Sequence, residues 1–168
     1  MKTLVKYFSF FMIFILLSCG YRMAGFEKID IKDKFYLSSI KNLTSESDYT
    51  SILNSTCYDF FNKHNLLTKN PNNNLKLSIE INKIFYESKI IQQNYRATSS
   101  ELHISVTIKV KKSEKEIFRK TYTDSNNYTI YTNITQTLSS KQEALIKSLN
   151  NILLDFINDF KEEINHNR

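Results

Sequence analysis

Hydrophobic and polar residues alternate along two central segments of the chain. The apolar positions are Leu75, Leu77, Ile79 and Ile81 in the first segment and Leu102, Ile104, Val106, Ile108 and Val110 in the second. A period of two is typical of a strand with one face in the core and the other in water. A turn over residues 112–115 and a further strand over 117–122 predict an antiparallel hairpin. An aromatic, β-rich segment over residues 35–40 predicts an earlier strand.

Two other segments repeat their apolar residues every three or four positions, as helices with one buried face do. The first covers residues 49–61, with Ser45, Ser47 and Asp48 as candidate caps. Its apolar positions are Tyr49, Ile52, Leu53, Cys57, Phe60 and Phe61. The second follows a capping box that predicts a long helix beginning at Ser140. Its stripe is Leu145, Leu149, Ile152, Leu153, Phe156, Phe160 and Ile164, widened by Ile146, Leu154 and Ile157.

The order strand, helix, three strands, helix predicts an α+β fold. Strictly alternating strands have one wet face, so both helices should cover the same side of a four-stranded sheet. We therefore expect a two-layer sandwich in a single domain over residues 34–168. The segment Asn70-Pro71-Asn72-Asn73-Asn74 predicts a loop between the first helix and the second strand.

The start of the chain predicts export. A basic segment over residues 1–6 and an apolar run over 7–17 are typical of a secretory signal, and the run is shorter than a membrane span. Leu16-Leu17-Ser18-Cys19 resembles the lipobox of bacterial lipoproteins, in which the cysteine is acylated and begins the mature protein. We expect a signal peptide over 1–18 and a lipidated tether over 19–33. The alternative for Cys19 is an ordinary thiol beside a plain cleavage site or a membrane helix.

Composition and charge argue against several functions. The formal net charge is +6, and loss of Lys2 and Lys6 with the leader leaves +4, without the basic stripe of a nucleic-acid partner. If Cys19 carries lipid, Cys57 has no disulfide partner and is expected to be a small buried hydrophobe. His64, His103 and His166 lack metal-ligand spacing, and no nucleophile elbow or phosphate loop is present. We expect no metal, no cofactor and no enzyme, although catalytic residues need not form a local motif.

The order of elements and several short motifs resemble the LPS-assembly lipoprotein family. The matching segments are Cys19-Gly20-Tyr21, Gly25, Ile40-Lys41-Asn42-Leu43-Thr44, Arg96-Ala97-Thr98 before a strand, and Glu143-Ala144-Leu145 in the last helix. The likeness covers essentially the whole mature chain, and its order of elements is more specific than its individual motifs. The chain departs from the family in having Tyr95 where family members have a glycine.

The resemblance implies a protein without enzymatic activity. It would lodge inside the outer-membrane β-barrel that inserts lipopolysaccharide, as a plug and assembly aid. It would be anchored on the periplasmic side of the outer membrane, and Gly20 rather than aspartate after Cys19 agrees with that address. Lipopolysaccharide carries phosphates, and Arg96, Lys109, Lys111 and Lys112 are candidate ligands near one hairpin and its approach. The alternative is a solvated basic hairpin.

Two other classes of function stay open. One is a lipid-anchored periplasmic module that regulates a cell-wall synthase or scaffolds an envelope complex; the other is a surface lipoprotein that binds host or environmental ligands. A cell-wall regulator usually has a long tether. About 15 residues separate Cys19 from Phe35, which reach about 50 Å when extended. The short tether favours a partner in the membrane.

Overall fold

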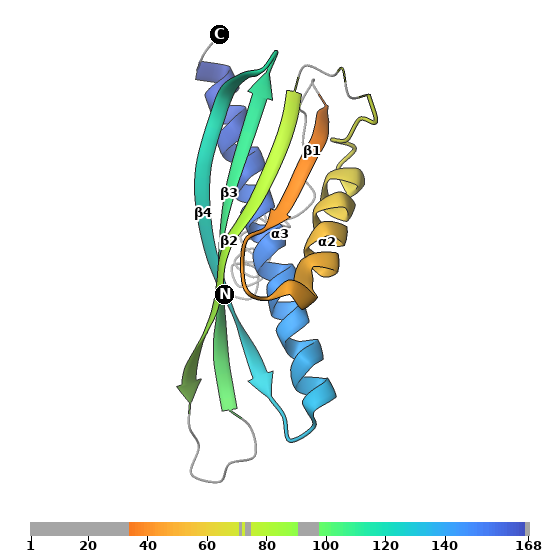
Figure 1. Cartoon of the computed structure of the whole chain (residues 1–168). Helices are drawn as coiled ribbons and strands as arrows, with labels where there is room; N and C mark the ends of the chain where they lie inside the picture. The colour runs from red at the N-terminus through yellow and green to blue at the C-terminus, as the bar shows by residue number, and fades with distance from the viewer. Residues whose placement is uncertain (1–33, 71, 73–74, 91–97, 167–168) are drawn as a thin grey trace, which may run out of the picture.

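The computed structural model describes residues 34–70, 72, 75–90 and 98–166, and the predicted leader, tether and Cys19 lie outside them. A single four-stranded sheet has the order β1-β2-β3-β4 (Figure 1). β1 pairs with β2 in parallel, and the other two pairings are antiparallel. The strands are β1 (Phe35–Asn42), β2 (Leu75–Ile90), β3 (Thr98–Lys112) and β4 (Lys115–Ile130); the helices are η1 (Ser47–Tyr49), α2 (Thr50–Lys63) and α3 (Ile134–His166).

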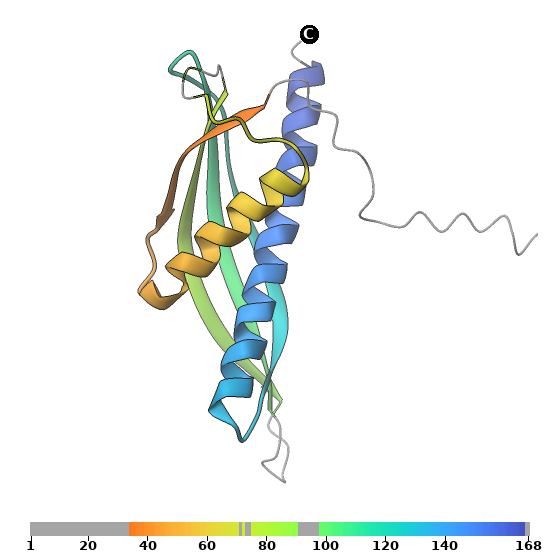
Figure 2. The same cartoon turned by 90° about the vertical axis from the view of Figure 1, so that its right-hand side faces the viewer.

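The predicted α+β sandwich is confirmed. α2 connects the parallel pair β1 and β2, and α3 follows the β2-β3-β4 meander. Both helices lie on the same side of the sheet (Figure 2). The opposite side, called the uncovered face below, carries no layer of the described chain. No helix within the described residues is long and apolar enough to cross a membrane.

The core lies between the sheet and the two helices. All nine of the apolar positions that alternate along the two central strands are buried there. Five phenylalanines from β1, β4 and both helices join the layers through ring contacts at centroid distances of 5.3 to 6.4 Å. They are Phe35, Phe61, Phe118, Phe156 and Phe160. Cys57 is completely buried as expected, and burial raises the pKa of its thiol to about 12.

The strands are longer than their alternation indicates. β2 continues to Ile90, and an extra residue at Asn82 shifts its register with β3 between Ile81 and Lys83. This β-bulge moves the inward positions from odd to even numbers, so that Ile84 is buried. β4 runs to Ile130, and its later residues, which include Asn126 and Tyr128, are mostly polar or aromatic. Aliphatic residues at every second position therefore do not identify the later part of either strand.

Two predictions about α3 are wrong. α3 begins at Ile134, and Ser140 lies inside it, where its Oγ accepts a hydrogen bond from the Thr129 amide at 3.0 Å. Ile134 and Leu138 are exposed, so the first turns carry no apolar stripe. Ile146 and Leu154 are also largely exposed and line a groove between α3 and α2, whereas Ile157 is buried.

The expected side-chain caps of α2 are absent from the described structure. Tyr49 occupies the N-cap position without a capping hydrogen bond from its side chain, and η1 precedes it. Asn42 organises this turn instead. Its Nδ2 donates to the Glu46 carbonyl and the Thr50 hydroxyl, both at 3.0 Å, and its Oδ1 accepts from the Thr44 amide at 3.1 Å. The Asn-x-Thr part of the motif at Ile40–Thr44 therefore shapes the β1–α2 connection.

Candidate functional site on the uncovered sheet face

Polar residues of neighbouring strands pair across the uncovered face. Lys109 Nζ on β3 donates to Glu80 Oε2 on β2 at 2.6 Å, and both side chains are about four-fifths buried. This hydrogen bond lowers the pKa of the Glu80 carboxyl. Beside this pair, Asn82 Nδ2 donates to Thr107 Oγ1 at 2.8 Å. Thr107 also shares a 2.8 Å hydrogen bond with the Thr121 hydroxyl, which extends the network to β4.

The structure places the predicted phosphate ligands in different environments. Lys109 already pairs with Glu80, whereas Lys111 and Lys112 are exposed at the end of β3. Acidic groups also lie at this end of the sheet. Glu114 forms a hydrogen bond with Lys76 that lowers the pKa of its carboxyl, with smaller help from the charge of Lys111.

Arg96 lies outside the described residues, as does Cys19. The described part of β3 begins at Thr98, at the other end of the strand from the three lysines. Eleven residues separate Thr98 from Lys109, which is about 37 Å at about 3.4 Å per residue. The lysines therefore cluster at the hairpin end, away from the first described residue after Arg96.

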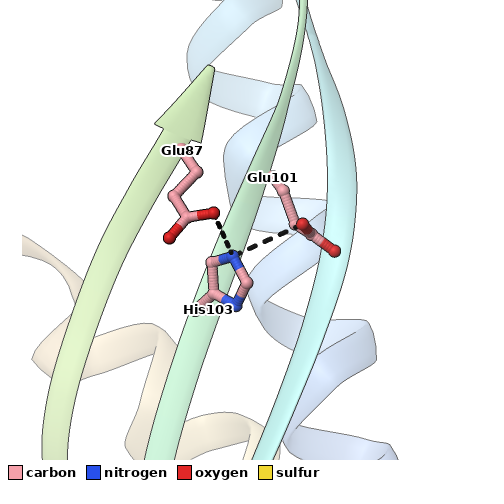
Figure 3. A group of neighbouring side chains, drawn as sticks. All are labelled: Glu87, Glu101 and His103. Atoms are coloured by element: carbon pink, nitrogen blue, oxygen red, sulfur yellow. Dashed lines mark ion pairs between the residues drawn. The ribbon is translucent and has the colours of Figure 1, made fainter. Parts of the chain in front are cut away.

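A second group of side chains gathers near the other end of the sheet. His103 Nε2 lies 3.4 Å from Glu101 Oε2 on the same strand and 3.6 Å from Glu87 Oε2 on β2 (Figure 3). The three ligand-type atoms all lie within 4.8 Å of one another. Glu101 is 13% exposed, His103 25% and Glu87 58%. We call these residues the Glu–His–Glu cluster.

The cluster is braced by its neighbours. Ser125 on β4 donates a hydrogen bond to Glu101 Oε1 at 2.7 Å, which turns Oε2 toward the histidine. The Phe85 ring stacks on the imidazole at 4.5 Å between centroids, with an angle of 6° between the planes. His103 Nε2 is buried and has no hydrogen-bond partner among the described residues. The cluster can therefore present one nitrogen and two carboxylate oxygens to a bound cation.

Sequence spacing does not reveal this cluster. Glu87 and Glu101 are direct partners in the β2–β3 register, but the chain between them is not described throughout. Glu87 faces the same side as His103 only because the bulge at Asn82 reverses the phase of β2. The sequence does carry a signal of the bulge. Its apolar residues stand at odd positions up to 81 and then at even positions, Ile84 and Tyr86.

Solved structures share this fold at low sequence identity. A candidate lipoprotein from Caulobacter crescentus is 12% identical, with a TM-score of 0.54 over 77% of this chain and 92% of that one. A Xanthomonas campestris protein of the DUF330 family is 12% identical, with a TM-score of 0.54 over 80% and 89%. A candidate neuraminyllactose-binding hemagglutinin homologue from Helicobacter pylori is 11% identical, with a TM-score of 0.50 over 83% and 90%.

These likenesses define a class of fold. The chain has the two-layer α+β architecture of proteins that include a candidate bacterial lipoprotein. No family model matches the sequence, and no curated protein matches it. At these identities the comparisons establish the fold alone.

Proposed function

We propose that this protein is an outer-membrane lipoprotein that complexes with the β-barrel translocon of lipopolysaccharide and serves as its plug and assembly factor. Cys19 would carry the lipid anchor, and the domain would sit on the periplasmic side. The proposal rests on the lipobox, on the sequence resemblance and on the shape and polarity of the domain. The fold shared with a candidate lipoprotein is consistent with it.

One observation carries the proposal: a long, narrow domain presents a polar sheet face that none of its described elements covers. α3 has 33 residues, which span about 50 Å at about 1.5 Å per residue. Four strands at a spacing of about 4.8 Å make a sheet only about 14 Å wide between its outer strands. The interior of a transmembrane barrel is polar. A narrow body whose uncovered sheet face carries polar side chains, such as the paired Glu80 and Lys109, is suited to that environment.

Site-specific photo-crosslinking can test this arrangement. One photoreactive residue would replace Thr123, which is exposed on the uncovered face, and another would replace Asn158, which is exposed on the outer side of α3. A plug is surrounded by its barrel, so both positions should crosslink to the same large outer-membrane barrel in intact cells. The crosslinked partner would be identified by mass spectrometry. The lipidated protein should also recover that barrel in near-equal amount from detergent-solubilised envelopes.

The other outcomes separate the alternatives. Crosslinking from Thr123 alone would indicate a protein docked by its sheet and would reject the plug. A cell-wall synthase as the crosslinked partner, or no barrel from either position, would reject the translocon and support the tethered regulatory module. A Cys19→Ser variant retained in the envelope by another means would show whether the anchor itself is needed.

We further propose that Lys111 and Lys112 contact lipopolysaccharide phosphates. Both are exposed, and lysine can pair with phosphate oxygens as a point charge. Reversing both charges should weaken lipopolysaccharide binding several-fold at low salt, whereas Lys147→Glu on the exposed side of α3 should not. Arg96→Asp is the corresponding test of the position taken from the family loop. Equal binding by all variants would remove these residues from the site.

A further inference from the structure

We propose that the Glu–His–Glu cluster is a binding site for a divalent transition-metal ion, with Zn²⁺ as the ion that fits it best. Glu87 and Glu101 each supply one carboxylate oxygen, and His103 supplies Nε2. The site lies on the uncovered face (Figure 3). In the β2–β3 register it is near the end of the sheet opposite the basic hairpin. It is independent of the lipopolysaccharide proposal.

The separations of the ligand atoms agree with tetrahedral coordination. Zinc bonds to nitrogen and oxygen of about 2.0–2.1 Å place neighbouring ligands of a tetrahedron about 3.3–3.4 Å apart. The observed distances from His103 Nε2 are 3.4 Å to Glu101 Oε2 and 3.6 Å to Glu87 Oε2. The Glu87 and Glu101 oxygens lie at most 4.8 Å apart and must come closer together to bind one ion. Glu87 is exposed enough to make that movement. Only side-chain adjustment is needed.

The electrostatics of the cluster also favour a cation. Glu87 and Glu101 face each other directly across two strands, where like charges destabilise a sheet. A divalent ion between them would attract both carboxylates and offset that repulsion. His103 Nε2 is a buried nitrogen that points between the carboxylates and lacks a hydrogen-bond partner among the described residues. Coordination would satisfy it.

The residues around the ligands hold them in position. Ser125 fixes the orientation of Glu101 through a hydrogen bond to Oε1, as hydrogen bonds to ligand carboxylates do at metal sites. Stacking on Phe85 limits rotation of the imidazole. Both supports come from strands, which keep their geometry better than loops. The ligand set is therefore largely formed before an ion binds.

The ligand chemistry selects among ions. One imidazole and two carboxylates suit Zn²⁺ and related transition metals, whereas Mg²⁺ and Ca²⁺ prefer oxygen ligands alone. Three protein ligands leave a fourth position for water or a donor from another molecule. Glu87 is 58% exposed, so solvent can reach the cluster.

Isothermal titration of the full chain in detergent would test the site. The lipidated protein would be stripped with a chelator before Zn²⁺ is added. We expect one ion per chain, with a dissociation constant in the micromolar range or tighter. His103→Ala should weaken binding at least a hundredfold and Glu87→Gln about tenfold. The matched control, His64→Ala at the end of α2, should bind as the parent does.

Two further readouts keep the test decisive. Co²⁺ should give the visible absorption of a tetrahedral complex, and His103→Ala should abolish it. Glu87→Gln changes an exposed side chain, so its far-UV circular dichroism should match that of the parent. No zinc binding by the parent, or equal binding by the parent and His103→Ala, would overturn the proposal. The cluster would then be a structural contact between carboxylates and imidazole.

Discussion

Replacing Phe156 by alanine is expected to cause a large loss of stability, because this side chain connects every layer of the fold. Phe156 lies on α3 and is completely buried. Its ring packs against four other phenylalanine rings. The distances between ring centroids are 5.8 Å to Phe35 of β1, 6.4 Å to Phe61 of α2, 5.5 Å to Phe118 of β4 and 5.7 Å to Phe160 of α3. The substitution opens a cavity that neighbours on four different elements cannot fill together.

The magnitude follows from the size of the group that is removed. Phenylalanine-to-alanine changes in packed cores cost about 3–5 kcal/mol, and the loss of edge-to-face ring contacts favours the upper part of that range. A domain of this kind has a free energy of unfolding of about 5–15 kcal/mol, so the variant would lose about a fifth of it or more. Phe156→Leu keeps part of the volume and should cost less.

Urea unfolding followed by far-UV circular dichroism at neutral pH would measure the difference. Leu154→Ala is the matched control, two residues away on the same helix but with a side chain that is 40% exposed. It should lose less than about 1 kcal/mol, as partly exposed substitutions generally do. A loss for Phe156→Ala below about 1.5 kcal/mol, or equal to that of the control, would refute the view that this ring cluster holds the layers together.

Three other predictions concern the turn between β3 and β4, the carboxylate of Asp159 and the thiol of Cys57. Ser113 and Glu114 have positive φ values of 49° and 69°, so Ser113→Asn with Glu114→Gly should raise Tm by a few degrees; an unchanged Tm in a thermal melt would contradict this. Burial acts to raise the pKa of Asp159, but hydrogen bonds from Lys120 and Tyr122 outweigh it and the pKa is lowered. Asp159→Asn should therefore destabilise the protein at pH 7, and the deficit should shrink below about pH 4, where the unfolded carboxyl protonates; a deficit constant with pH in urea titrations would contradict it. In a Cys19→Ser chain, Cys57 should react with a disulfide reagent only after unfolding in concentrated urea, because burial raises its pKa to about 12; rapid reaction of the folded protein would contradict that expectation.

The fold could be predicted because its strongest signals are local. Alternation over residues 75–81 and 102–110 identifies the central strands, and the three- and four-residue spacing of α2 and α3 shows which helix faces are buried. The start of α3 could not be predicted in this way. Its first turns carry the exposed Ile134 and Leu138, while Ser140 resembles a cap but serves as an acceptor for the β4 backbone.

The basic site shows a different limit of sequence reasoning. Charge counts identify Lys109, Lys111 and Lys112 as equivalent cations, but only the fold reveals that Glu80 lies against Lys109. Glu80 is 29 residues away in the chain, and cross-strand pairing decides the contact. Lys111 and Lys112 are consequently the stronger candidates for phosphate. The placement of Arg96 is outside the described residues and stays a sequence-based expectation.

The bulge at Asn82 connects the architecture to the proposed metal site. Without the extra residue, odd-numbered positions of β2 would continue to face the core beyond Ile81, and the Glu87 carboxylate would point into the apolar layer. The bulge turns Phe85 and Glu87 to the uncovered face, opposite His103 and Glu101. An acidic pair directly across a sheet costs energy unless a cation lies between its members. Since the same bulge supplies both the stacking ring and the second carboxylate, it builds a cation site at that end of the sheet rather than a neutral extension of the core.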